Sequence, residues 1–218
     1  MSNELLNRIL TSFVLLPILI CSLYFSGPIF IAFLSIIYFI SFYEVIKNTK
    51  NLFFNFIINI LIIFALYSFY FLRGETNYSL TTICWILSAT FLSDIGGYTF
   101  GKFFKGKKLT RISPNKTISG SIGSIIFSFF SLPLLNFLQN IIFNENLINL
   151  YQFKYFFITI LISTICQLGD LFVSFWKRKA NIKNISNILP GHGGVLDRID
   201  GLIFVLIFCF LLKNINLI

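Results

Sequence analysis

Residues 52–72 read LFFNFIINILIIFALYSFYFL, a run of 21 residues without a charged side chain. An apolar run of about 20 residues is long enough to cross the hydrocarbon core of a bilayer as an α-helix. Further apolar stretches lie on both sides of this run. Together they predict seven membrane spans, at about residues 9–26, 28–43, 52–72, 79–100, 118–143, 153–176 and 199–213.

The composition of the whole chain agrees with a membrane protein. Of the 218 residues, 56% are hydrophobic and 11% are charged, and the mean hydropathy is +0.85. Soluble domains carry about 25% charged residues, and a chain of this length cannot bury so many apolar side chains in one water-soluble core. We therefore expect an all-α, polytopic membrane bundle. It forms a single domain over 1–218, with hydrophobic spans in 1–78 and the chemistry in 79–218.

The basic residues are distributed unequally between the connecting segments. Fourteen of the 17 Lys and Arg residues lie at the N-terminus and in 44–51, 101–117 and 177–198, which alternating spans place on one side. By the positive-inside rule this side is cytoplasmic, which predicts an N-in, C-out topology. The net charge of +9 lies between apolar runs, so it favours anionic lipids or phosphorylated substrates as partners and not nucleic acid.

Four aspartates lie at or inside the predicted spans. Asp94 and Asp170 are near the cytoplasmic ends of the fourth and sixth spans, and Asp197 and Asp200 open the seventh. A carboxylate at membrane depth is costly, so four that converge suggest a shared cation or a polar cavity. The alternative is that some are helix-end residues that favour the helix dipole, which does not explain Asp170.

Helical spacing places several polar residues on one face of the sixth span. Gln167, Asp170, Ser174 and Lys177 follow one another at intervals of three or four residues. The face thus runs from a carboxylate to a basic loop. Such an arrangement suits a polyphosphate, because carboxylates hold Mg²⁺ and cationic side chains neutralise phosphate oxygens.

Two loops are candidates for phosphate binding. Residues 189–194 read LPGHGG before a helix start, so glycine N–H groups could cradle a phosphate, and His192 is the single histidine. In 101–117, the turn SPNKT at 113–117 places a lysine and hydroxyls before a helix. The alternative is that the basic residues of this loop only determine the topology and contact anionic lipids. Gly120 and Gly123 on the following helix predict close packing against a neighbour.

Taken together, these residues resemble the phosphatidate cytidylyltransferase (CDP-diacylglycerol synthase) family over about residues 85–213. Two shorter blocks fit, Asp94-x-x-Gly97-Tyr98-x-x-Gly101-Lys102 and Ser113-Pro114-x-Lys116-Thr117-x-x-Gly120, and so does Gln167-x-Gly169-Asp170. The main motif is Ser174-x-x-Lys177-Arg178-x4-Lys183-x2-Ser186-x2-Leu189-Pro190-x-His192-Gly193-Gly194-Val195-x-Asp197-Arg198-Ile199-Asp200. The chain departs from the family pattern at Ser119 and Asn184, where acids are common, and at Trp176.

The resemblance implies an enzyme that transfers cytidylate from CTP to phosphatidate and releases pyrophosphate. It implies an active site on the cytoplasmic face of the inner membrane. Asp170 and Asp197 would hold a divalent cation, with Asp94 and Asp200 supporting or joining that site. The implied catalytic residues are Asp170, Asp197, Asp200, Lys177 and Arg198, and the implied substrate-binding residues are Ser113, Lys116, Thr117, Ser174, Arg178, Lys183, His192, Gly193 and Gly194.

The implied cofactor is Mg²⁺, and the resemblance leaves open a monovalent cation such as K⁺ beside it. Family members are often dimeric, which leaves a homodimer open, although no residue here indicates a dimer interface. Three alternatives also stay open. They are a CTP-dependent polyprenol kinase, which would need a base for its hydroxyl acceptor, a small transporter, and a non-catalytic scaffold.

Overall fold

The computed structural model describes residues 3–48, 52–110, 113, 116–144, 147–179, 182, 185–186, 188 and 193–218. Over these residues no β-strand forms, and an isolated bridge pairs Lys108 with Thr117. The all-α prediction is therefore confirmed. The helices are α1 (Asn3–Phe25), α2 (Gly27–Asn48), α3 (Leu52–Arg73), α4 (Asn77–Phe104), α5 (Ile118–Ser128), α6 (Ser131–Phe143), α7 (Phe153–Lys179) and α8 (Leu196–Asn214).

Five segments of the described chain are long and apolar enough to cross a membrane. They are α2, α3, α4, α7 and the stretch 118–143 that contains α5 and α6. α1 adds a shorter apolar stretch, Leu10–Phe25, while α8 carries charged residues in its first turns. The chain is thus an integral membrane protein with at least five segments of spanning length among its described residues.

The predicted span 118–143 is not one continuous helix. It is broken at Phe129 and Phe130, where the hydroxyl of Ser131 donates to the carbonyl of Ser128 at 2.7 Å. Pro133 lacks the N–H that would continue the helical ladder to the carbonyl of Phe129. A hydropathy pattern does not register such a break, because both halves are apolar.

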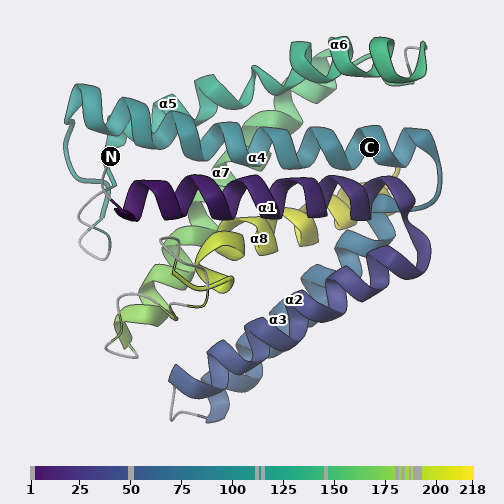
Figure 1. The fold of residues 1–218 in the computed structure, drawn as a ribbon. Coiled ribbons are helices and arrows are strands. Elements are labelled where there is room, and N and C mark those ends of the chain that lie inside the picture. Colours follow the sequence, from purple (N-terminus) through teal and green to yellow (C-terminus); the bar gives the residue numbers. More distant parts are fainter. Residues whose placement is uncertain are drawn as a thin grey trace.

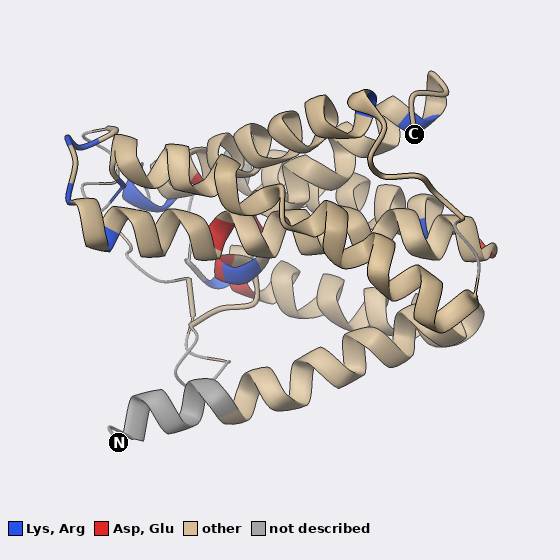
Figure 2. Ribbon diagram, turned by 90° about the horizontal axis from the view of Figure 1, so that it is seen from above, with Lys and Arg blue, Asp and Glu red and all other residues tan. Residues whose placement is uncertain are grey.

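The spanning segments alternate in direction, so that the C-terminal ends of α2, α4 and α7 lie at one end of the bundle (Figure 1). The two ends of the chain lie at opposite ends of the bundle in the same view. Lys and Arg gather mainly at the end where α4 and α7 finish, while most of the acidic residues that are coloured lie deeper in the bundle (Figure 2). The basic residues are therefore unequally distributed between the two ends of the bundle, as they are between the connecting segments of the sequence.

At the other end, two basic side chains cap helix C-termini. Arg73 is buried and donates to the carbonyls of Leu23 and Tyr24 at the end of α1, at 2.5 and 3.3 Å. Lys213 donates to the carbonyls of Phe71 and Leu72 at the end of α3, at 3.2 and 3.4 Å. Positive groups are favourable at helix C-termini, which explains two of the three basic residues at this end.

Glycines bring α4 and α5 into close contact, as Gly120 and Gly123 predicted. A Cβ on Gly120 would lie 2.8 Å from the carbonyl oxygen of Gly97, and one on Gly123 would overlap Phe100. α7 and α8 also cross closely, because a Cβ on Gly201 would lie 2.7 Å from the Sγ of Cys166. Both crossings occur beside the aspartates of the predicted site, so close helix packing is what brings those carboxylates together.

Candidate active site

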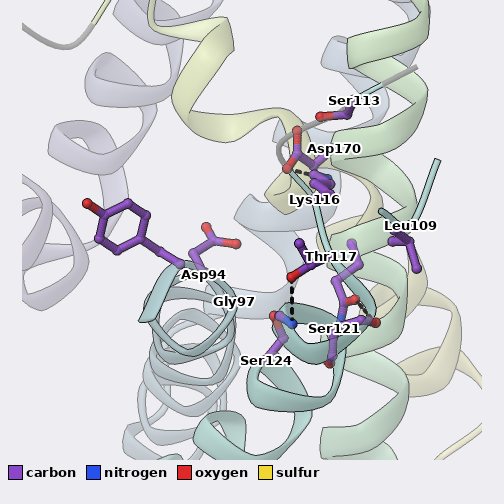
Figure 3. Close-up of a pocket in the computed structure, with 12 residues that line it drawn as sticks. Asp94, Gly97, Leu109, Ser113, Lys116, Thr117, Ser121, Ser124 and Asp170 are labelled. Atoms are coloured by element: carbon purple, nitrogen blue, oxygen red, sulfur yellow. Dashed lines mark hydrogen bonds and ion pairs between the residues drawn. The ribbon is translucent and has the colours of Figure 1, made fainter. Parts of the chain in front are cut away.

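A polar cavity of about 290 Å³ opens between α4, α5, α7 and the connection that precedes α5. Figure 3 shows the side chains of Asp94, Lys116, Thr117 and Asp170 around this space. Hydroxyl and amide side chains cover much of the remaining wall. The lining residues are Asp94, Gly97, Tyr98, Leu109, Ser113, Lys116, Thr117, Gly120, Ser121, Ser124, Gln167 and Asp170.

The connection before α5 folds as a short hairpin that carries Lys116 into the cavity. Its backbone bonds run from the N–H of Leu109 to the carbonyl of Lys116 at 2.7 Å and from the N–H of Ile118 to the carbonyl of Lys107 at 2.9 Å. The N–H of Lys116 donates to the carbonyl of Ser113 at 3.1 Å, which is the turn that the sequence predicted. The hairpin therefore holds Lys116 in a defined place.

Lys116 pairs with the first predicted site aspartate. Its Nζ lies 2.5 Å from Oδ2 of Asp170, although the two residues are 54 positions apart in the chain. Ser174 donates to the other oxygen of Asp170 at 3.4 Å, as their shared helix face predicted. Thr117 caps α5, because its Oγ1 accepts from the N–H of Gly120 at 3.1 Å. The structure thus brings the 113–117 turn and the predicted face of α7 into one site.

A second group of charges lies at the start of α8. Lys177 Nζ is 3.0 Å from Oδ1 of Asp197 and 3.6 Å from Oδ2 of Asp200. The side chains are nearly buried, with exposed fractions of 12% for Lys177, 11% for Asp197 and 14% for Asp200. The prediction that Asp197 and Asp200 share a helix face is confirmed, because both reach the same ammonium group.

The two groups of charges are neighbours. Asp200 interacts electrostatically with Asp170 and Asp94, and the exposed Arg198 acts on Asp94. Cys166 donates from Sγ to Oδ1 of Asp94 at 3.6 Å and lies between these acids. The α7–α8 crossing at Gly201 and Cys166 therefore places three carboxylates of three helices around one part of the bundle.

These carboxylates do not form a complete metal cage. Among the residues that the structure describes, no three acidic, histidine or cysteine side chains converge as a ready-made metal site. Mg²⁺ often uses only one or two protein carboxylates together with phosphate and water oxygens, so the donor chemistry fits a cation that arrives with a nucleotide. Asp197 is already engaged at both oxygens, by Lys177 and by the N–H groups of Ile185 and Gly194 at 3.0 and 3.1 Å.

Of the glycine loop at 189–194, the structure describes Gly193 and Gly194. Gly193 has φ of +86°, a conformation that favours glycine. The N–H of Gly194, one of the glycine N–H groups that the sequence suggested for phosphate, instead donates to the carboxylate of Asp197, and the next two N–H groups donate to Glu44. Lys183 and His192 lie outside the described residues. Arg178 is exposed at the end of α7.

Glu44 was not among the residues that the sequence assigned to the site. It lies on α2 and is fully buried against the start of α8. The sequence carried one signal, since Glu44 is an acid near the cytoplasmic end of its predicted span. No motif connected it with residues 150 positions away.

The comparisons with known proteins agree with the resemblance. A family model described as "Cytidylyltransferase family" matches residues 47–215. Proteins named phosphatidate cytidylyltransferase are 42% identical over 114 residues in Rickettsia conorii, covering 52% of this chain and 49% of the relative, and 41% identical over 140 residues in Staphylococcus aureus strain COL, covering 63% and 50%. The chain spans about half the length of the curated relatives it matches. By the extent of the family match, the chain belongs to the cytidylyltransferase family.

Proposed function

We propose that this protein transfers cytidylate from CTP to phosphatidate, giving CDP-diacylglycerol and pyrophosphate. The observation that carries the proposal is the polar cavity in an otherwise apolar bundle, with Lys116 paired to Asp170 at 2.5 Å on its wall. An ammonium group has three N–H donors, so Lys116 can form charge-assisted hydrogen bonds with an anionic substrate in addition to its bond with Asp170. Family membership and the names of the relatives support the same reaction.

In this reaction an oxygen of the phosphatidate phosphate attacks the α-phosphorus of CTP. The bond between that phosphorus and the bridging oxygen to the β-phosphate breaks, and pyrophosphate leaves. The attacking phosphate is already ionised near neutral pH, so the site needs no general base. Catalysis then depends on positioning and charge neutralisation. We assign this role to Lys116, Lys177, Arg178, Lys183 and Arg198, with hydroxyls from Ser113, Thr117 and Ser174.

We further propose that the cofactor is Mg²⁺, held by Asp170 with Asp94 and Asp200. The mutual electrostatic interaction of these three acids supports this set. Asp197 would join them only after exchanging Lys177 for the cation. When bound, Mg²⁺ would neutralise phosphate oxygens of CTP. A K⁺ ion beside it and a homodimer remain hypotheses, and light scattering of the detergent-solubilised protein tests the second.

The reaction is tested with CTP labelled at either the α- or the γ-phosphorus. The purified protein in detergent with Mg²⁺ is expected to transfer α-label to phosphatidate, to release pyrophosphate, and to stop when a chelator removes the metal. γ-Label in a long-chain polyprenol would instead establish a lipid kinase. Folded protein that labels neither lipid would reject both activities and leave a scaffold or transporter.

We also propose seven spans with the N-terminus inside and the C-terminus outside, in the cytoplasmic membrane, with the active site facing the cytoplasm. The basic end of the bundle supports this orientation (Figure 2). Single cysteines introduced at Lys108 and at Glu75 lie at opposite ends and are both exposed. In intact cells, a membrane-impermeant thiol reagent is expected to label position 75 and to spare position 108 until the cells are opened. The reverse pattern would overturn the orientation.

A further inference from the structure

The carboxylate of Glu44 on α2 binds the start of α8. Its Oε1 accepts from the N–H of Val195 at 2.9 Å and from the hydroxyl of Ser186 at 2.5 Å, and its Oε2 accepts from the N–H of Leu196 at 3.0 Å. The side chain is fully buried. Glu44 therefore binds the chain between α7 and α8 at two points, at Ser186 and at the start of α8.

α8 has no side-chain cap from its own N-cap residue. Val195 precedes the helix and provides no side-chain hydrogen bond to it. The first N–H groups of a helix have no partner within the helix, and a carboxylate is a favourable group to receive them. Glu44 takes two of these N–H groups and Asp197 takes that of Gly194.

The absence of a side chain at Gly194 leaves room for the Glu44 carboxylate. A Cβ at position 194 would lie 2.9 Å from each oxygen of Glu44, which is too close for a side chain. The glycine at this position therefore has a packing reason that is independent of phosphate binding.

The first turn of α8 carries both acids of the second charge group. Asp197 and Asp200 reach Lys177 from this turn, at 3.0 and 3.6 Å. A shift of the turn would change both distances together. Oδ2 of Asp197 accepts from the N–H groups of Ile185 and Gly194, and Oδ1 accepts from Lys177.

We infer that Glu44 is a positioning residue, which holds the start of α8 so that Asp197, Asp200 and Lys177 keep the geometry that the reaction needs. Its effect on turnover rests on the proposed cytidylate transfer. Its effect on the structure rests only on the hydrogen bonds. Glu44 precedes the residues matched by the family model, so neither the motifs nor the match assigns it a role.

The test uses Glu44→Gln in the full-length protein. Glutamine has the same volume, but it carries no charge and its NH₂ group cannot accept from Leu196. We expect kcat to fall about 10- to 100-fold, as for a misplaced reacting group, while KM for CTP stays within about threefold. A residue that only filled space would show no such loss. Glu44→Asp keeps the charge but is one methylene shorter, so we expect an intermediate loss.

Hydrogen–deuterium exchange gives a readout that does not depend on activity. In Glu44→Gln, amides at 193–200 are expected to exchange faster than in the wild type, while α4 keeps its protection. The matched control is Gln139→Leu, because buried Gln139 also binds backbone, at the N–H and carbonyl of Ile148, but on α6 at the other end. Its variant is expected to keep kcat and the protection of 193–200.

The outcomes separate the two proposals. If the wild type transfers cytidylate and Glu44→Gln keeps kcat within threefold of it, or loses no more than Gln139→Leu, the positioning role is overturned. If the wild type transfers no cytidylate, the proposed function fails, and the exchange at 193–200 decides whether Glu44 holds α8. Unchanged exchange there would overturn the inference in either case.

Discussion

Asp170→Asn is expected to lower the turnover of cytidylate transfer by at least about 100-fold. The substitution keeps the size of the side chain but removes the charge that holds Lys116 at 2.5 Å. It also removes the central oxygen ligand of the proposed Mg²⁺ site. The measurement is kcat at saturating CTP, phosphatidate and Mg²⁺ in detergent.

Two comparisons make the Asp170 result specific. Glu75→Gln is the same chemical change at an exposed position on the opposite end of the bundle, and it is expected to leave kcat unchanged. In the double variant Asp170→Asn with Lys116→Met, the losses are expected not to add, because the two groups act as a pair. A loss of less than tenfold in Asp170→Asn would contradict the metal assignment.

Lys177→Met is expected to destabilise the protein and to remove activity from the part that stays folded. It leaves Asp197 and Asp200 with exposed fractions of 11% and 14% and without their shared counter-charge. Breaking a buried pair by removing one partner costs about 3–5 kcal/mol. The measurement is the midpoint of thermal unfolding in detergent, together with kcat.

The second variant in this series is Lys177→Met with Asp197→Asn. It is expected to regain part of the lost stability, because one uncompensated charge is gone, but to stay inactive. Lys179→Met is the matched control, since Lys179 is exposed two positions further along α7 and rests on the ring of Phe175. Unfolding of Lys177→Met at the temperature of the wild type would show that this ion group does not support the fold.

Local sequence determined the elements of this protein. A long apolar run such as 52–72 satisfies its own backbone in a bilayer when it folds as an α-helix, and a helix forms there. Helical spacing was also sufficient to place Asp170 beside Ser174, and Asp197 beside Asp200. The turn at 113–117 and the small residues at 120 and 123 indicated the hairpin and the close contact of α4 with α5. These features depend on neighbours within a few positions.

The tertiary structure decided which charges meet. Lys116 pairs with Asp170, and Glu44, on a different helix from either, caps α8 across 151 positions. No local pattern encodes these contacts, because they depend on where helices cross, and the crossings depend on backbones approaching at Gly97 with Gly120 and at Gly201 with Cys166. The start of α8 illustrates the difference. The glycines of 189–194 indicated a cradle for phosphate, but the N–H of Gly194 donates to Asp197 and the next two N–H groups donate to Glu44, since a buried helix start must be satisfied within the protein.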